Sequence, residues 1–194
     1  MTDLAQMFKP LGEGGKPSSI KRRHPVEPII PVPADAPAMR FQHPKYGQPV
    51  QTWPYHDADG NLCGYECRFE FKTAEGSIGK KYLPVTFCDI GGGRKAWRAK
   101  GIPAPRPLHN VPEILARPDA PVLVCEGPKA ASAAKNMFPD YVVTTSMGGA
   151  QSPKKTDWTP LRNRNVVGWP DNDDAGQEYI ATVINLACNP ARPQ

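Results

Sequence analysis

Two stretches of the sequence decide the fold: Val122-Leu123-Val124-Cys125-Glu126-Gly127 and Trp169-Pro170-Asp171-Asn172-Asp173-Asp174-Ala175-Gly176. The first is a short apolar run followed by Glu-Gly, and such a run is typical of a strand buried on both faces of a parallel sheet. The second places acidic residues closely after residues 165–169, which predict a further strand. Both stretches therefore predict strands whose carboxyl ends carry acidic side chains.

The residues around these stretches alternate between helix and strand patterns. Residues 128–137 are rich in alanine and begin with proline, which favours the first turn of a helix. Residues 141–145 predict a second strand, and residues 174–187 predict a second helix. This order of elements predicts an α/β fold with a parallel, Rossmann-like sheet over residues 119–190.

Three carboxylates are the candidate functional groups of this sheet: Glu126, Asp171 and Asp173. If the first and third strands are neighbours, these groups converge on the edge where open parallel sheets bind ligands. Oxygen ligands grouped in this way suit Mg²⁺ or Mn²⁺, and three nearby anions repel one another without a cation. The alternative is structural, because Asp173 or Asp174 can cap the helix that follows.

The chain before residue 119 predicts two further regions. Residues 1–50 hold many of the 24 prolines and a glycine-rich stretch, so they predict a disordered tail or linker. Residues 51–118 predict a small antiparallel β-rich module with a short helix towards its end. Its expected strands lie at 51–56, 62–71 and 80–88, with a turn at 57–61 and a glycine turn at 91–93.

The net charge of +5 is unevenly distributed. Residues 1–120 carry 17 Lys or Arg against 12 Asp or Glu, and residues 121–194 carry seven of each, which together give the totals of 24 and 19. A dense cationic segment in the front part can neutralise nucleic-acid phosphates, and a solvated surface explains it equally well. Its members are Lys80, Lys81, Arg94, Lys95, Arg98, Lys100 and Arg106.

Targeting signals and cysteine usage limit the class of protein. The five cysteines include no Cys-x-x-Cys pair, which favours reduced thiols. The sequence shows no charged leader followed by an apolar core, and no run of 18 apolar residues. We therefore expect a cytoplasmic protein with no membrane partner.

The two deciding stretches resemble the signature motifs of the Toprim fold, which primases, topoisomerases and some nucleases share. The resemblance is strongest to the Toprim segment of phage and plasmid primase-helicase proteins. That segment carries Glu-Gly-x-Lys-Ala-Ala, Thr-Thr followed by Gly-Gly, and Asp-Trp-x-Pro-Leu, which this chain matches at 126–131, 144–149 and 157–161. Two departures are Pro128, where a second Glu is frequent, and an end soon after the second helix, which predicts a truncated Toprim domain.

The resemblance implies a DNA primase-like, Mg²⁺- or Mn²⁺-dependent nucleotidyltransferase of phage or plasmid replication. Its partners would be single-stranded DNA, nucleoside triphosphates and a replicative helicase. One alternative is a Toprim nuclease that cleaves phosphodiesters, and another is a non-catalytic nucleic-acid-binding accessory module or a fragment of a primase-helicase. In the primase reading, Asp171 and Asp173 would ligate the metal, and Glu126 would ligate it or act as general base.

Further contacts are expected around this centre. Lys129, Gly148 and Gly149 would contact nucleotide phosphates, with a surface lysine and a plain turn as the alternatives. Lys154 and Lys155 would contact the template backbone, unless they lie in a solvated loop. Two tryptophans are expected in the core, with base stacking as the alternative: Trp158 and Trp169.

Overall fold

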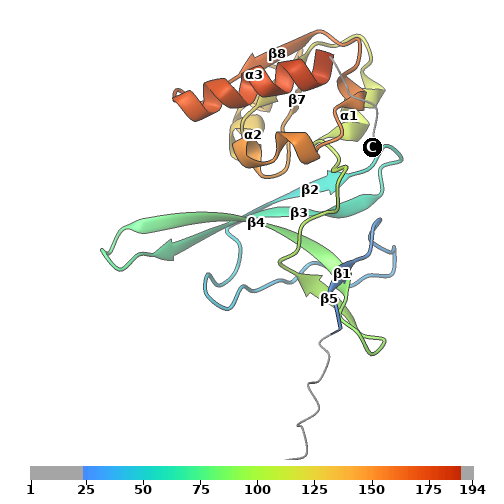
Figure 1. Cartoon of the computed structure of the whole chain (residues 1–194), viewed down its shortest axis with the longest axis vertical. Helices are drawn as coiled ribbons and strands as arrows, with labels where there is room; N and C mark the ends of the chain where they lie inside the picture. Colours follow the sequence, from blue (N-terminus) through green and yellow to red (C-terminus); the bar gives the residue numbers. More distant parts are fainter. Residues whose placement is uncertain (1–23, 189–194) are drawn as a thin grey trace, which may run out of the picture.

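The computed structural model describes residues 24–188 as an antiparallel sheet and a parallel α/β unit, which lie at opposite ends of the molecule in Figure 1. The antiparallel sheet has the strand order β1-β4-β3-β2, and β5 also pairs with β4. The long β3–β4 hairpin projects beyond the rest of the sheet (Figure 1). The strands are β1 (Glu27–Pro28), β2 (Gln51–His56), β3 (Leu62–Lys72), β4 (Ile78–Asp89) and β5 (Lys95–Arg98).

The predicted strands at 51–56, 62–71 and 80–88 are confirmed, with β4 beginning two residues earlier than expected. The turn between β2 and β3 is closed by Asp57, whose Oδ1 accepts the N–H groups of Asp59 at 3.0 Å and Asn61 at 2.8 Å. An aspartate that bonds the backbone ahead of it favours a tight turn. The three glycines at 91–93 all have positive φ, as expected for the turn between β4 and β5.

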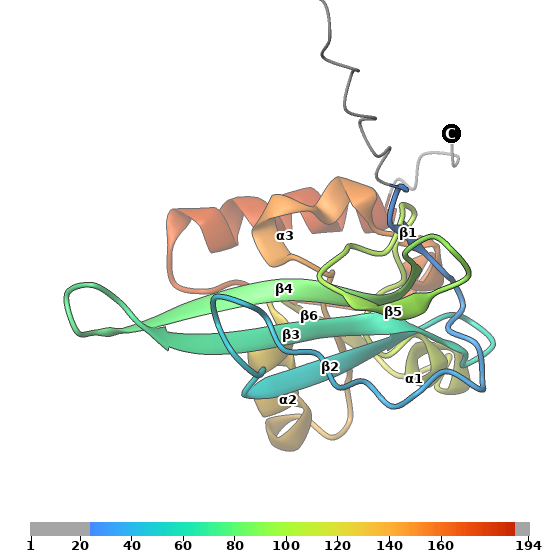
Figure 2. The ribbon, with the colours of Figure 1, turned by 90° about the horizontal axis from the view of Figure 1, so that it is seen from below.

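The prediction of a disordered tail through residue 50 is wrong for residues 24–50. β1 pairs with the end of β4, and the N–H of Ile29 donates to the carbonyl of Phe87 at 2.8 Å. Apolar side chains of this segment, Val32 and Phe41 among them, pack against the buried Phe69. The segment therefore covers one face of the sheet, opposite to the helices (Figures 1 and 2).

Proline explains this difference between sequence and structure. Its fixed φ suits an extended segment that lies across a sheet as well as one that stays in solvent, so the prolines of this region do not distinguish the two. The apolar residues between the prolines decide the outcome, because they bury against the aromatic face of β3 and β4. Residues 1–23 of the predicted tail lie outside the described residues.

The parallel unit contains three parallel strands in the order β7-β6-β8. This order confirms the predicted parallel sheet and places the first and third strands side by side; the finer assignment to a Toprim fold stays a prediction. The 3-10 turns η2 (Gly149–Gln151), η3 (Pro153–Lys155) and η4 (Thr159–Leu161) link β7 to β8. The remaining elements are β6 (Val122–Cys125), β7 (Val142–Thr144), β8 (Val166–Trp169), α1 (Val111–Ala116), α2 (Pro128–Met137) and α3 (Asp174–Cys188).

Helices cover both faces of this sheet, which explains the continuous apolar run of β6. Val122 and Val124 pack with residues of α1 and α3, such as Ile114. Leu123 and Cys125 point to the other face and pack against Ala131 and Ala134 of α2. None of the helices within residues 24–188 is long and apolar enough to cross a membrane.

The two tryptophans predicted in the core differ in burial. Trp158 is buried, and its Nε1 donates to the carbonyl of Pro153 at 2.8 Å, which confirms the prediction. Trp169 is 43% exposed, so the core prediction is wrong for this residue. The physical reason is topological, because β8 is an edge strand of the three-stranded sheet and one side of it has no neighbour.

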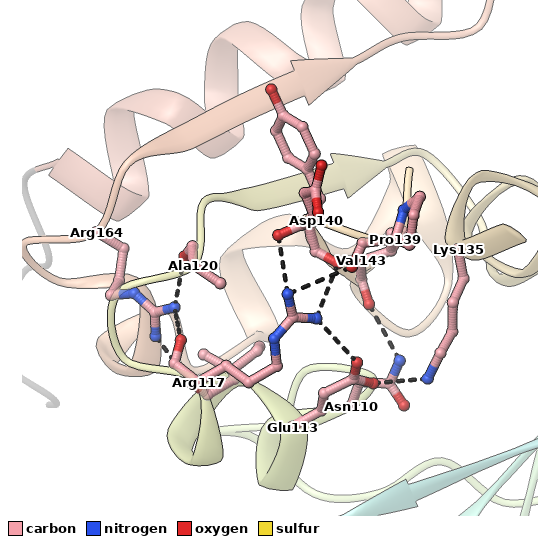
Figure 3. A network of polar contacts seen from close by, with 11 residues as sticks. Asn110, Glu113, Arg117, Ala120, Lys135, Pro139, Asp140, Val143 and Arg164 are labelled. Carbon is pink, nitrogen blue, oxygen red and sulfur yellow. Dashed lines mark hydrogen bonds and ion pairs between the residues drawn. The ribbon is translucent and has the colours of Figure 1, made fainter. Parts of the chain in front are cut away.

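Polar contacts attach α1 to the parallel unit (Figure 3). The guanidinium of Arg164 donates to the carbonyls of Ile114, Arg117 and Ala120 at 2.6–2.8 Å. Lys135 of α2 pairs with Glu113 of α1 at 2.7 Å. The Arg164 contacts satisfy carbonyl groups at and just beyond the carboxyl end of α1, where the helix supplies no donors for them.

Candidate functional site

An open cleft of about 1420 Å³ lies between β3 and β4 of the antiparallel sheet and the carboxyl edge of the parallel sheet. Most of the predicted site residues line it. The predicted residues in the cleft wall are Glu126, Asp171, Lys129, Gly148, Gly149, Lys80, Lys81, Lys154 and Lys155. The fold thus brings together groups that belong to two separately predicted regions of the sequence.

Four members of the predicted cationic segment lie elsewhere: Arg94, Lys95, Arg98 and Lys100 are absent from the cleft wall. Lys95 of β5 lies opposite Asp89 in the register of the β4–β5 strand pair, and Asp89 is eight residues beyond Lys81 along β4. At the rise of an extended strand, this separation is about 26 Å. The expected single cationic patch is therefore two patches, because the two groups of cations lie near opposite ends of β4.

Glu126 lies directly after β6 and before Gly127, the N-cap of α2. Its Oε2 is buried and has no hydrogen-bond partner. Burial raises the pKa of this carboxyl group, and the nearby charges of Asp171 and Asp173 raise it further, while the backbone N–H of Asp171 acts in the opposite direction. Asp171 and Asp173 thus lie close enough to Glu126 to affect the protonation of its carboxyl group.

Asp173 has a structural role at the start of α3. Its Oδ1 accepts the backbone N–H of Gly176 at 2.7 Å, as the capping alternative predicted. Gly176 is needed for close packing, because a Cβ at this position would lie 2.6 Å from the carbonyl oxygen of Asp171 and 2.9 Å from Oε2 of Glu126. The Asp-x-Asp-x-x-Gly pattern therefore shapes the loop that carries Asp171 into the cleft.

The loop at Gly148 and Gly149 forms another part of the cleft wall. Both residues have positive φ, at 86° and 52°, and a Cβ on Gly149 would lie 3.0 Å from the carbonyl oxygen of Glu126. Behind the loop, the hydroxyl groups of Ser146 and Tyr179 lie 2.8 Å apart in a buried hydrogen bond. The glycines thus allow the loop to approach the end of β6 closely, and α3 holds it there.

Sequence reasoning missed Glu66, which lines the cleft from β3. Its side chain is only 3% exposed and joins the two sheets, because it accepts the Tyr55 hydroxyl at 2.9 Å and the Gly148 N–H at 3.3 Å. Burial raises its pKa, while these hydrogen bonds and the charge of Arg106 act in the opposite direction. The available signal was a Glu that alternates with Arg68 and Glu70 along one face of a predicted strand, since a buried charge needs polar partners.

The carboxylate edge offers part of the ligand set that a divalent cation needs. Within residues 24–188, no three His, Cys, Asp or Glu side chains are grouped so that they could hold an ion by themselves. Mg²⁺, however, is usually bound by one or two carboxylates together with substrate phosphates and water. The buried, unpartnered oxygen of Glu126 beside the exposed carboxylate of Asp171 fits that pattern.

The charge of the cleft wall suits an anionic ligand. Its six cationic side chains outnumber its four acidic ones, and Glu66, one of the four, is buried. Five of the cations come from β4, η3 and the first turn of α2, and Arg106 lies between β5 and α1, so the cations surround the Glu126 and Asp171 edge from several directions. Such a wall can bind several phosphate groups at once. The six cations are Lys80, Lys81, Arg106, Lys129, Lys154 and Lys155.

No protein-family model matches this chain, and no curated protein matches it. Among solved structures, the chain is similar to a DnaG catalytic core at 20% identity and a TM-score of 0.42. It is also similar to the DnaG primase catalytic domain bound to ssDNA, at 18% and 0.40, and to the E. coli primase catalytic core, at 16% and 0.40. Each match covers 70% of this chain and 39% of the length of the other chain.

Proposed function

We propose that the cleft is the active site of a DNA primase-like nucleotidyltransferase that uses Mg²⁺ or Mn²⁺, nucleoside triphosphates and a single-stranded DNA template. One observation supports this proposal most strongly. The unpartnered, buried oxygen of Glu126 faces the Asp171 loop in a cleft whose other walls are cationic. A carboxylate edge inside a cationic cleft suits a metal-bound triphosphate better than it suits a neutral ligand.

The chain's own residues have separate roles in this proposal. Asp171 and Asp173 would hold the metal, and Glu126 would ligate it or accept the proton of the attacking hydroxyl group. The raised pKa of Glu126 brings its carboxylate closer to the basicity that proton transfer requires. When bound, the metal supplies positive charge that stabilises the developing charge at phosphorus.

The cations and the glycine loop would position the reactants. Lys129 lies exposed on the first turn of α2 beside Glu126, where it can neutralise a phosphate of the incoming nucleotide. The backbone at Gly148 and Gly149 can approach a phosphate closely because these residues lack side chains. Lys154 and Lys155, exposed on η3, would contact the template backbone. A replicative helicase of a phage or plasmid system is the proposed partner that supplies the template.

Primer synthesis on single-stranded DNA tests the proposal. The protein is incubated with labelled ribo- or deoxyribonucleotides and Mg²⁺ or Mn²⁺, beside the variants Glu126→Gln, Asp171→Asn and Asp119→Asn. Asp119 is an exposed aspartate outside the cleft wall and serves as the matched control. We expect short template-dependent products from the wild type and the control, and a loss of at least about 100-fold in both cleft variants.

The same reactions distinguish the alternatives. Cleaved template without extension would replace the primase proposal with a Toprim-like nuclease, in which water attacks the phosphodiester at the same carboxylate edge. Salt-sensitive DNA binding without either activity would replace it with a nucleic-acid-binding accessory module. Products that persist in Glu126→Gln and Asp171→Asn would show that another site performs the chemistry.

A further inference from the structure

The cleft contains an exposed aromatic ring that the proposed chemistry does not use. Tyr82 of β4 is 37% exposed and lines the cleft. Among the large apolar side chains that are exposed within residues 24–188, it is the one that belongs to the cleft wall. A single exposed apolar residue is ordinary on a protein surface, so its exposure alone carries no meaning; its position in a cationic cleft makes this ring a candidate ligand contact.

One face of this ring is fixed by another aromatic ring. Trp53 lies on β2, and its ring is nearly parallel to that of Tyr82, with centroids 6.1 Å apart and an angle of 22° between the planes. This spacing falls in the range of offset-stacked aromatic pairs. The strand register explains the meeting, since Trp53 and Tyr82 lie opposite Glu66 and Arg68 of β3, which share one face of the sheet.

Trp53 is itself held by the parallel unit. It is only 5% exposed, and its Nε1 donates to Oγ of Ser132 at 2.8 Å. The Ser132 hydroxyl in turn donates to the carbonyl of Pro128 in the first turn of α2 at 2.9 Å. The Tyr82 ring therefore packs on one face against a tryptophan whose position is fixed by hydrogen bonds. A ligand that stacks on the other face of Tyr82 loses little side-chain entropy, because the ring is already ordered.

Cations flank the open face of the ring. Lys80 lies two residues before Tyr82 and so on the same face of β4, and Lys81 also lines the cleft. At these residues β4 pairs with β3 on one side, and its other side has no partner strand within residues 24–188. Lysines on an edge strand also discourage pairing with other chains, but that role does not account for an aromatic ring beside them. A cationic groove that contains a stacking platform is the feature by which proteins bind single-stranded nucleic acid without sequence preference.

We propose that Tyr82, supported by Trp53, stacks against a base of single-stranded nucleic acid whose phosphates lie on Lys80 and Lys81. The inference deepens the proposed function, on which it rests for the choice of ligand. It places the single-stranded nucleic acid against the wall of the cleft formed by the antiparallel sheet, to which the carboxylate chemistry assigns no ligand. The stacked base would hold the strand in register while the Glu126 and Asp171 edge lies on the opposite wall.

Binding of labelled oligonucleotides to the full chain tests this inference. The probes are a thymidine oligonucleotide and an abasic oligonucleotide of the same length, so that they differ only in the bases. The variants are Tyr82→Leu, Tyr82→Phe and Trp169→Leu, the last being an exposed aromatic residue outside the cleft. We expect Tyr82→Leu to weaken binding of the thymidine probe by roughly 5- to 150-fold and to leave the abasic probe unchanged.

The other variants define the specificity of the result. Tyr82→Phe and Trp169→Leu should bind both probes as the wild type does. Lys80→Gln should weaken both probes alike and reduce the salt slope of binding by about 0.7, the effect of one phosphate contact on a single strand. Equal loss of both probes in Tyr82→Leu, or a loss confined to nucleoside triphosphate binding, would overturn the inference.

Photocrosslinking tests the inference in the unaltered protein, so no substitution can affect the result through folding. A 5-iodouracil oligonucleotide bound to the unaltered protein should crosslink to Tyr82, as mapped by mass spectrometry, and crosslinks confined to other residues would contradict the stacked geometry. Failure of the proposed function remains distinguishable. DNA binding that depends on Tyr82 without primer synthesis would contradict only the primase proposal. Primer synthesis that does not depend on Tyr82 would contradict only this inference.

Discussion

The two faces of the antiparallel sheet differ in what covers them and in the charge of their side chains. One face packs against residues 24–50 and is a closed aromatic layer around Phe69, whose ring lies 6.3 Å from that of Phe41. The other face points towards the parallel unit and carries Glu66, Arg68 and Tyr82. Alternate residues of the same strand therefore serve different purposes, since successive side chains of a strand point to opposite faces.

This contrast teaches how the molecule combines stability with an open cleft. The closed face buries mainly apolar and aromatic side chains, and such burial is the main source of folding free energy. The cleft face instead buries the carboxyl group of Glu66, and across the cleft an oxygen of Glu126 has no hydrogen-bond partner; both features cost stability. We expect substitutions on the closed face to lower the free energy of unfolding more than substitutions at the cleft do.

The largest effect is expected for Phe69→Ala on the closed face. Phe69 is fully buried, so its truncation leaves a cavity between the sheet and residues 24–50. The free energy of unfolding should fall by about 3–5 kcal/mol, measured by urea denaturation followed by circular dichroism. Ile78→Ala, at a position that is 66% exposed on the same hairpin, should change it by less than about 0.5 kcal/mol. Equal effects of the two variants would contradict the contrast.

A smaller effect is expected for Glu66→Ala on the cleft face. The substitution leaves the Tyr55 hydroxyl and the Gly148 N–H without their acceptor, which should cost about 2–3 kcal/mol in the free energy of unfolding. Glu66→Gln keeps one acceptor oxygen and should cost less. Amide hydrogen exchange at Gly148 gives a local readout, because its protection should fall in Glu66→Ala. Unchanged protection would show that the loop does not depend on this contact.

The smallest effect has the opposite sign. Glu126→Gln removes a carboxyl group whose pKa is raised by burial and by two neighbouring aspartates, so the variant should be more stable than the wild type at pH 7 by on the order of 0.5 kcal/mol after solvent screening. The raised pKa means that the folded state binds the proton more tightly. The stabilising contribution of the protonated group is therefore complete below the ordinary pKa of 4.5 and is lost as the pH rises through the raised value.

Thermal denaturation across this pH range checks the prediction. The difference in Tm between Glu126→Gln and the wild type should be positive at pH 7 and should shrink towards zero below pH 4.5. Asp119→Asn supplies the control, as an exposed carboxylate away from the cleft. A variant that is less stable than the wild type at pH 7 would mean that the Glu126 carboxylate has a stabilising partner.

Much of the parallel unit could be predicted from the sequence. The apolar run at β6 and the alanine-rich α2 are local patterns, and their predicted bounds agree with the structure to within a residue. The neighbouring placement of β6 and β8 also follows the prediction, and it explains why Asp171 affects the pKa of Glu126. The site could be predicted this far because acidic residues at strand ends converge wherever parallel strands are adjacent.

The sequence by itself determined most of the strands and helices and the carboxylate edge, because each depends on the spacing of residues within a short window; β1 and β5 were not predicted. Only the tertiary structure decided that residues 24–50 cover a sheet, that the cationic segment divides into two patches, and that Glu66 contacts Gly148 from 82 positions away. These features arise when two sheets bury surface against each other and against an extended segment. That burial joins residues that are distant in the chain, and no short window of sequence contains both partners.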